Sequence, residues 1–183
     1  MKIICRINTL FLMLLASSIT RAEPYYEISG SAFATDNAPM PQHIRGIGEK
    51  MIVVDPREHF FGAYNASGKL IRWGLATAGK DYCRDSNEAC RTRTGNYRIY
   101  SLGSENCTSK KYPQPFGGAP MPYCMFFASG QAIHGSDEVA FDNESHGCIR
   151  VHVSDAKWLR YEFVEAPSSK NHFRGTVVKI KPY

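Results

Sequence analysis

The sequence lacks several features that would define a protein class at once. It has no Cys-x-x-Cys pair, no internal repeat, no heptad pattern and no low-complexity run. Its basic residues form no cluster beyond Lys110-Lys111, and no stretch after residue 22 is apolar enough to cross a membrane. These absences argue against repeat proteins, coiled coils, nucleic-acid binding and a membrane anchor in the mature chain.

The first 22 residues have the pattern of a secretory signal peptide. Lys2 and Arg6 form a short basic region, the segment 7–19 is almost entirely apolar or small, and Thr20-Arg21-Ala22 places small residues before a cleavage site. The alternative is a membrane anchor, but the apolar run is short for a bilayer. No cysteine follows the run, so we expect no lipoprotein attachment. The segment therefore predicts export.

The remaining 161 residues have the length of one domain with its own core. Cleavage removes three basic residues and no acidic ones, so the formal charge of the chain falls from +5 to +2. This balance gives no reason to expect a nucleic-acid partner. Residues 23–49 have few apolar clusters and predict a loosely structured leader, followed by a domain over residues 50–183.

Five cysteines follow the signal peptide, and export would place them in an oxidising compartment. An odd number predicts two disulfides and one free thiol, although the sequence permits several connectivities. Local spacing favours Cys83–Cys90 around a polar loop and Cys107–Cys124 around a loop rich in proline and glycine. Cys148 is then the free cysteine.

Short apolar runs separated by turn residues predict a mostly β domain. A single helix is expected where Ser154 has the character of an N-cap and Trp158, Leu159 and Phe163 give a partly apolar face. Residues 105–122 form a long segment with little regular pattern, which is typical of a functional loop. Strands are expected at 51–54, 60–64, 70–76, 97–102, 124–127, 131–134 and 176–180.

Two segments concentrate the residues that a cysteine nucleophile requires: Ala132-Ile133-His134-Gly135-Ser136 and Ser145-His146-Gly147-Cys148-Ile149-Arg150. Such a nucleophile needs a base, donors for an oxyanion and a backbone that presents the sulfur. His134 at a strand end is the candidate base, and the amides of Gly147 and Cys148 are candidate oxyanion donors. Arg150 is a candidate partner for a substrate carboxylate.

Two other interpretations apply to the same residues. A single histidine on a strand or a single buried cysteine is usually structural. His134, His146, Cys148 and His152 are also all metal-ligand types, but their spacing matches no common zinc pattern. We expect no metal and no cofactor.

The segment SHGCIRV, preceded by IHGS, resembles the catalytic signature of the YkuD-type L,D-transpeptidases. The resemblance covers roughly residues 51–181, including RTRTGNYRIY, where Arg93 replaces a usual proline, and GGAPMPYCMFF before the hairpin to His134. It is nearest to short, cysteine-rich members of the enhanced-entry type of Gram-negative bacteria. It implies a β-sandwich-like catalytic domain with one or two helices, in the periplasm or cell envelope, or secreted.

The resemblance also assigns roles to individual residues. Cys148 matches the nucleophile, His134 the proton donor and acceptor, and His146 a third catalytic-site residue. Substrate-binding or oxyanion roles fall on Ser145, Gly147, Arg150, Gly135 and Ser136. This chain departs from the family in two respects. Only ten residues separate His134 from Ser145, and no wall-binding module is recognisable.

The activity implied is acyl transfer on peptidoglycan stem peptides, with a tetrapeptide as donor and an amine as acceptor. The thiolate of Cys148 is acylated, D-Ala leaves, and the amine resolves the thioester to give a 3→3 cross-link or an attached protein. With water as acceptor the enzyme would be an L,D-carboxypeptidase. The remaining alternative is a non-catalytic module that binds peptidoglycan or a host protein.

Overall fold

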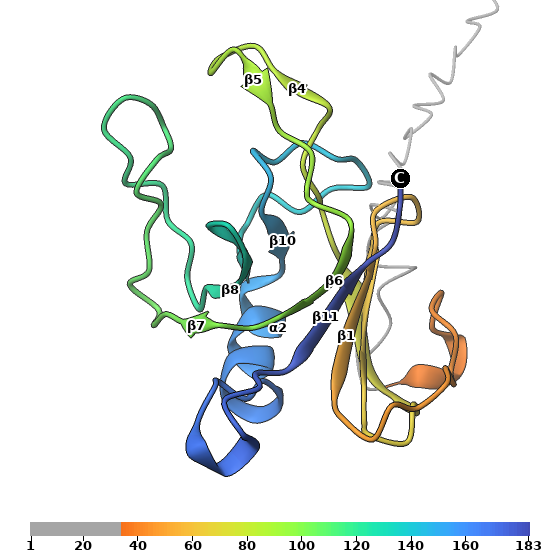
Figure 1. Ribbon diagram of the computed structural model, residues 1–183. Helices are drawn as coiled ribbons and strands as arrows, with labels where there is room; N and C mark the ends of the chain where they lie inside the picture. The colour runs from red at the N-terminus through yellow and green to blue at the C-terminus, as the bar shows by residue number, and fades with distance from the viewer. Residues whose placement is uncertain (1–33) are drawn as a thin grey trace, which may run out of the picture.

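The computed structural model describes residues 34–183. The predicted signal peptide and the first part of the leader, residues 23–33, lie outside the described residues. Two β-sheets face each other across an apolar core (Figure 1). No helix among the described residues is long and apolar enough to cross a membrane. The expected mostly β fold is confirmed.

The larger sheet has the strand order β3-β2-β1-β11-β6, and the smaller sheet has the order β10-β9-β8-β7. A separate two-stranded hairpin pairs β4 with β5. The strands are β1 (Met51–Asp55), β2 (Phe60–Tyr64), β3 (Leu70–Leu75), β4 (Tyr82–Cys83), β5 (Glu88–Ala89), β6 (Gly95–Arg98), β7 (Ser101–Leu102), β8 (Met125–Ala128), β9 (Gln131–Gly135), β10 (Ile149–Val151) and β11 (Val177–Ile180). The helical elements are η1 (Thr35–Asn37), α2 (Val153–Trp158), η2 (Leu159–Phe163) and η3 (Ser169–Asn171).

The first four residues of β1 are apolar because both faces of the larger sheet are covered. Ile52 and Val54 face the core between the two sheets, whereas Met51 and Val53 belong to a second cluster on the opposite face. Met40, within the expected leader, is buried in that second cluster. β1 lies parallel to β11, with Met51 opposite Val177.

Two local expectations were wrong. Residues 97–102 do not form one strand, because Ile99 and Tyr100 separate β6 in the larger sheet from β7 in the smaller sheet. Ser154 is not the N-cap: His152 caps α2, which continues after Trp158 into the π-helical turn η2. The strand is interrupted where the chain passes from one sheet to the other, and the helix starts where the chain leaves β10. A local sequence pattern does not show where such changes occur.

The disulfides are those that local spacing favours. Cys83 is bonded to Cys90 across the β4–β5 hairpin, and Cys107 is bonded to Cys124 at the base of the long loop before β8. Cys148 is the free cysteine among the described residues. The hairpin and the long loop both extend from the same end of the molecule (Figure 1).

Candidate active site

Parallel pairing of β9 with β10 brings Cys148 and His134 to the same side of the smaller sheet. Ile149 lies opposite Ile133, so Cys148, the residue before β10, lies next to Ala132. The Ala132 N–H donates to Cys148 Sγ at 3.4 Å. His134 lies two residues further along β9 and therefore points to the same face as Ala132. The sulfur and the imidazole line one cavity of about 450 Å³.

The tautomer of His134 is determined by its backbone neighbour. Nδ1 lies 2.9 Å from the carbonyl oxygen of Gly135. A carbonyl only accepts hydrogen bonds, so Nδ1 carries the proton and Nε2 of the neutral ring is free of one. Burial lowers the pKa of His134 to about 4, and the charge of Arg150 acts in the same direction. At neutral pH His134 is therefore a neutral ring with an available basic nitrogen.

The Cys148 sulfur is protonated at rest. Burial raises the pKa of the thiol, while the Ala132 N–H and the Arg150 charge act weakly in the opposite direction. A raised thiol pKa beside a lowered imidazole pKa disfavours a resting thiolate–imidazolium pair. The geometry instead suits a neutral pair in which the proton moves to His134 as the sulfur attacks.

A tight turn presents the sulfur. Gly147 has a φ of +110°, which strains any residue with a Cβ, and a Cβ there would lie 2.7 Å from Gln131 Nε2. Buried Ser145 holds the turn, because its hydroxyl accepts from the Gly147 N–H at 3.1 Å and donates to the Cys148 carbonyl at 2.5 Å. The Gly147 amide expected at the oxyanion is thus already bonded, and the Cys148 amide is the remaining backbone donor of that pair.

Charged and polar groups form one rim of the cavity. The Arg150 guanidinium lies 3.0 Å from the Glu138 carboxylate, whose side chain is 79% exposed. Such an exposed pair is readily exchanged for a substrate carboxylate. The expected residues Gly135 and Ser136 line the same rim, and the Ser136 N–H donates to the Val151 carbonyl at 2.9 Å.

His146 contacts two residues that sequence analysis missed. Its Nε2 lies 2.6 Å from the Asp85 carboxylate, and its ring lies 4.4 Å, centroid to centroid, from the ring of Tyr112. Both neighbours line the cavity that contains Cys148. The sequence signals for their position were the two disulfide-closed loops and the long irregular segment 105–122, and these signals did not single out either side chain.

Most of the domain that contains this cavity matches a known protein family. Residues 49–180 match the YkuD family, described as the L,D-transpeptidase catalytic domain. The chain belongs to the YkuD family. No curated protein sequence matches it significantly.

Solved L,D-transpeptidase structures share this YkuD fold. The Xylanimonas cellulosilytica protein is 21% identical with a TM-score of 0.59, and the match covers 77% of this chain and 64% of that one. L,D-transpeptidase 3 of Mycobacterium tuberculosis, with a faropenem-derived adduct, is 18% identical with a TM-score of 0.55, over 73% and 60%. A cysteine-to-serine mutant of the Enterococcus faecium enzyme is 23% identical with a TM-score of 0.56, over 72% and 49%. The chain thus spans under two thirds of each of these structures.

The structure brings together a group of residues of metal-ligand type that differs from the group considered in the sequence analysis. Within the described residues, the side chains with ligand atoms within 4.8 Å of one another are Cys83, Cys90 and His146. The two cysteine sulfurs are already bonded to each other, so they are not thiolate ligands. The four residues of the alternative metal interpretation, His134, His146, Cys148 and His152, do not form such a group within the described residues.

Proposed function

We propose that the chain is an exported peptidoglycan L,D-transpeptidase in which Cys148 is acylated by a stem tetrapeptide. The observation that carries the proposal is the free thiol of Cys148 beside a buried, neutral His134 with an unprotonated Nε2. This pair provides the nucleophile and the base that acyl transfer through a thioester requires. The membership of the YkuD family supports the same substrate class.

The first half-reaction forms a thioester. Cys148 Sγ attacks the carbonyl of the diamino acid at the third stem position as its proton passes to His134 Nε2. The tetrahedral oxyanion takes a hydrogen bond from the Cys148 amide. The C–N bond to the terminal D-Ala then breaks, and His134 returns the proton to the departing amine.

The second half-reaction releases the acyl group. An amine acceptor attacks the thioester carbonyl while His134 removes its proton, the C–S bond breaks, and the Cys148 thiol is restored. The product is a 3→3 cross-link or a peptide attached to a protein. Water in place of the amine gives hydrolysis and therefore a carboxypeptidase.

The cavity is suited to a peptide with ionised groups. Its lining includes the apolar residues Pro113, Pro120, Met121 and Pro122 and the charged residues Arg150 and Glu138. The apolar residues suit a peptide backbone and alkyl chain, and the charged residues suit a carboxylate and an amine. The two disulfides fit folding in an oxidising compartment, in keeping with export to the periplasm or cell envelope.

Intact mass spectrometry with disaccharide-tetrapeptide tests the proposal, with a Cys148→Ala protein as control. The wild type is expected to gain the acyl mass and release D-Ala, and the variant to do neither. Cross-linked dimers would identify a transpeptidase, and tripeptide alone a carboxypeptidase. A folded protein with a free thiol, no adduct and no D-Ala would instead favour the non-catalytic binding module.

The adduct of L,D-transpeptidase 3 provides a second probe. We expect a carbapenem to acylate Cys148, since attack of the thiol on the β-lactam carbonyl forms the same kind of thioester. The ring C–N bond breaks, and its nitrogen takes up the proton and stays attached to the adduct. His134→Ala should slow this acylation by about 10²-fold or more, because a positioned base contributes on that scale.

A further inference from the structure

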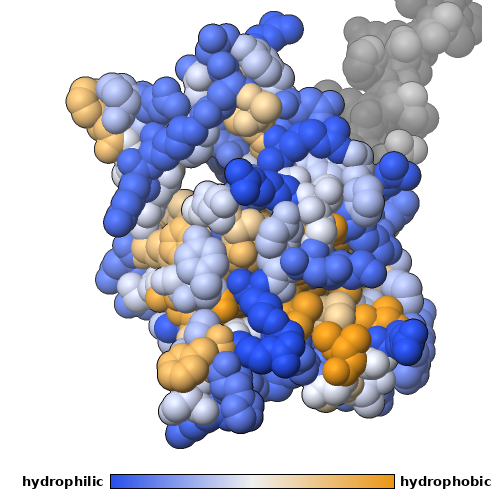
Figure 2. All heavy atoms as spheres, viewed as in Figure 1, coloured by the Kyte–Doolittle hydropathy of each residue, from blue (hydrophilic) through white to orange (hydrophobic). Residues whose placement is uncertain are grey.

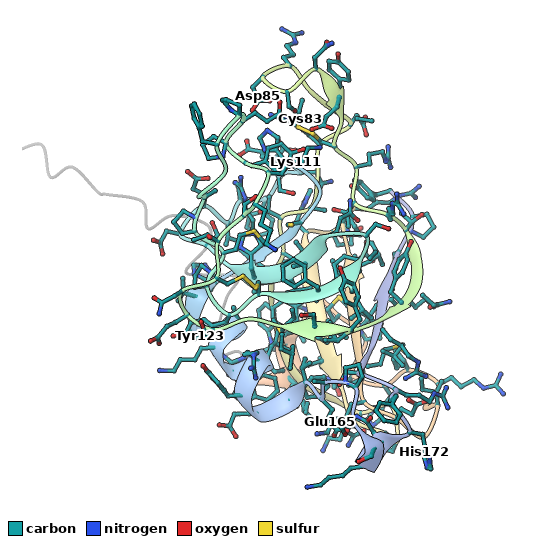
Figure 3. All side chains as sticks on the ribbon, turned by 60° about the vertical axis from the view of Figure 1, so that its left-hand side comes forward. Cys83, Asp85, Lys111, Tyr123, Glu165 and His172 are labelled. Carbon is teal, nitrogen blue, oxygen red and sulfur yellow. A yellow bond between two sulfur atoms is a disulfide. The ribbon has the colours of Figure 1, made fainter. Side chains whose placement is uncertain are left out.

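Two loops that are far apart in the sequence meet above the Cys148 cavity. The first is residues 83–90, the β4–β5 hairpin closed by Cys83–Cys90, and the second is residues 107–124, closed by Cys107–Cys124. Together we call them the roof. Figure 3 shows Cys83 and Asp85 of the first loop beside Lys111 of the second, and Figure 2 shows the surface hollowed between them.

One carboxylate joins the two halves of the roof. Glu88 accepts a hydrogen bond from Lys111 Nζ at 2.6 Å and another from the hydroxyl of Tyr112. The same Tyr112 turns its ring toward His146. The contact between the loops and the contact with the active site therefore pass through one side chain.

His146 is held from both halves of the roof. Asp85 of the first loop bonds its Nε2 at 2.6 Å, and the Tyr112 ring of the second packs against its ring in a tilted arrangement, with an interplanar angle of 39°. The imidazole is 22% exposed and lines the cavity beside Cys148. Gly147, which lies between His146 and Cys148 in the sequence, has no side chain that could contact the imidazole. The contacts that orient the His146 ring therefore come from the two loops.

The roof has little apolar burial with which to keep its shape. Within the roof, none of residues 107–120 is buried, and buried residues occur only where the loops join the domain: Cys83, Cys90, Met121, Tyr123 and Cys124. Its conformation therefore rests mainly on the two disulfides and on hydrogen bonds, which include the β4–β5 pairing and the backbone bonds within the second loop. A segment of this kind can loosen without unfolding the sheets below it.

We propose that Asp85 and Tyr112 are positioning residues that hold the His146 imidazole as one wall of the donor-peptide site, from loops kept in place by the disulfides. The inference rests on the proposed function, because it assigns the cavity to the donor. Neither residue touches the reacting atoms, and both act through His146. Substitution of Asp85 or Tyr112 should slow acylation of Cys148 by the donor peptide, while the intrinsic reactivity of the Cys148 thiol should stay unchanged.

Kinetics with two electrophiles separate these effects. The rate constant of Cys148 acylation by disaccharide-tetrapeptide should fall about tenfold in Asp85→Asn, Tyr112→Leu and the double variant Cys83→Ser/Cys90→Ser, since small misplacements in a site have effects of this order. Alkylation by iodoacetamide, which needs no peptide site, should stay within about twofold of the wild type.

The chain offers matched controls for both side chains. Asp81→Asn makes the same charge change beside the first loop, where Asp81 pairs with Arg91 and not with His146. Tyr82→Leu removes a tyrosine of β4 whose hydroxyl bonds Asn87. Both controls should keep wild-type acylation by the peptide. An equal fall in a control, or an equal fall in iodoacetamide alkylation, would overturn the positioning role.

NMR of the histidine rings tests the inference without any turnover. The nearby Tyr112 ring should shift the resonances of the His146 ring protons, and this shift should vanish in Tyr112→Leu and shrink in Asp85→Asn and in the double variant Cys83→Ser/Cys90→Ser. If the wild type is not acylated by the peptide, the proposed function fails while this readout still decides whether the roof holds His146. Unchanged His146 resonances, or wild-type peptide kinetics in Asp85→Asn, would disprove the inference.

Discussion

The larger β-sheet and the roof over Cys148 are built by opposite means. Every residue of β1 and of β2 is buried, and the sheet is covered by apolar clusters on both faces. The roof is mostly exposed. It is held by two disulfides, by the hydrogen bonds of Glu88 and by the contacts of Asp85 and Tyr112 with His146. From this difference we expect substitutions in the sheets to lower the free energy of unfolding, and substitutions in the roof to slow acylation by the peptide.

The largest expected effect on stability lies between the sheets. Phe61, 1% exposed, packs in the core between the two sheets. Phe61→Ala should lower the free energy of unfolding by about 4 kcal/mol, because it removes a large apolar group and leaves a cavity. Urea denaturation measures the change. The remaining folded protein should alkylate with iodoacetamide at the wild-type rate, and a much slower rate would show that core and site are not separable.

A buried ion pair next to the core gives the next effect. Arg72 lies 2.5 Å from Asp155 of α2, and both side chains are 8% exposed. Arg72→Met should destabilise the fold by about 3 kcal/mol, since it leaves the carboxylate unpaired in a buried site. Adding Asp155→Leu should restore much of this loss. Thermal unfolding of the three proteins gives the comparison, and additive losses in the double variant would contradict it.

The disulfide Cys107–Cys124 lies on the border between the two regions. Cys124 is fully buried and packs with Met121, Ala132 and Cys148, whereas the loop it closes is exposed. We expect Cys107→Ser/Cys124→Ser to lose about 2 kcal/mol, below the full chain-entropy value because the released loop also gains freedom in the native state. Chemical denaturation of this variant beside Cys83→Ser/Cys90→Ser should show the smaller loss in the latter. The reverse order would contradict the division.

The smallest perturbation is a change of pH, which acts on the site alone. Burial raises the pKa of Cys148, so the iodoacetamide rate should still be rising above pH 9. His134, with a pKa of about 4, keeps its basic nitrogen until the pH approaches that value. Peptide acylation should therefore persist at pH 5 and decline toward pH 4. An alkylation rate that levels off below pH 8 would indicate a resting thiolate and a different protonation state of the pair.

Histidine burial also links the site to stability. The pKa of His134 is lower in the folded chain than in the unfolded chain, so the unfolded state takes up the proton first as the pH falls. The free energy of unfolding is therefore unaffected by the protonation of His134 above the ordinary histidine pKa, and it falls as the pH is lowered from there toward 4. In His134→Gln, unfolding should lose this part of its pH dependence.

Local pattern was enough wherever neighbours in the sequence decide the structure. The apolar run 51–54 became most of β1, the strands expected at 124–127 and 131–134 became β8 and β9, and both disulfides closed the loops that spacing favoured. The motif around Cys148 identified the family because it packs nucleophile, turn and support into consecutive residues. In each case the chain needs only short-range contacts to specify the outcome.

Tertiary structure decided what depends on distant segments. It divided residues 97–102 between two sheets, paired β1 with β11, and committed the Gly147 amide to Ser145. It also placed Asp85 and Tyr112 against His146, from loops 61 and 34 positions away in the chain. Nothing local marks such residues, since an exposed aspartate and a loop tyrosine acquire a role only when the two closed loops are folded over the same turn.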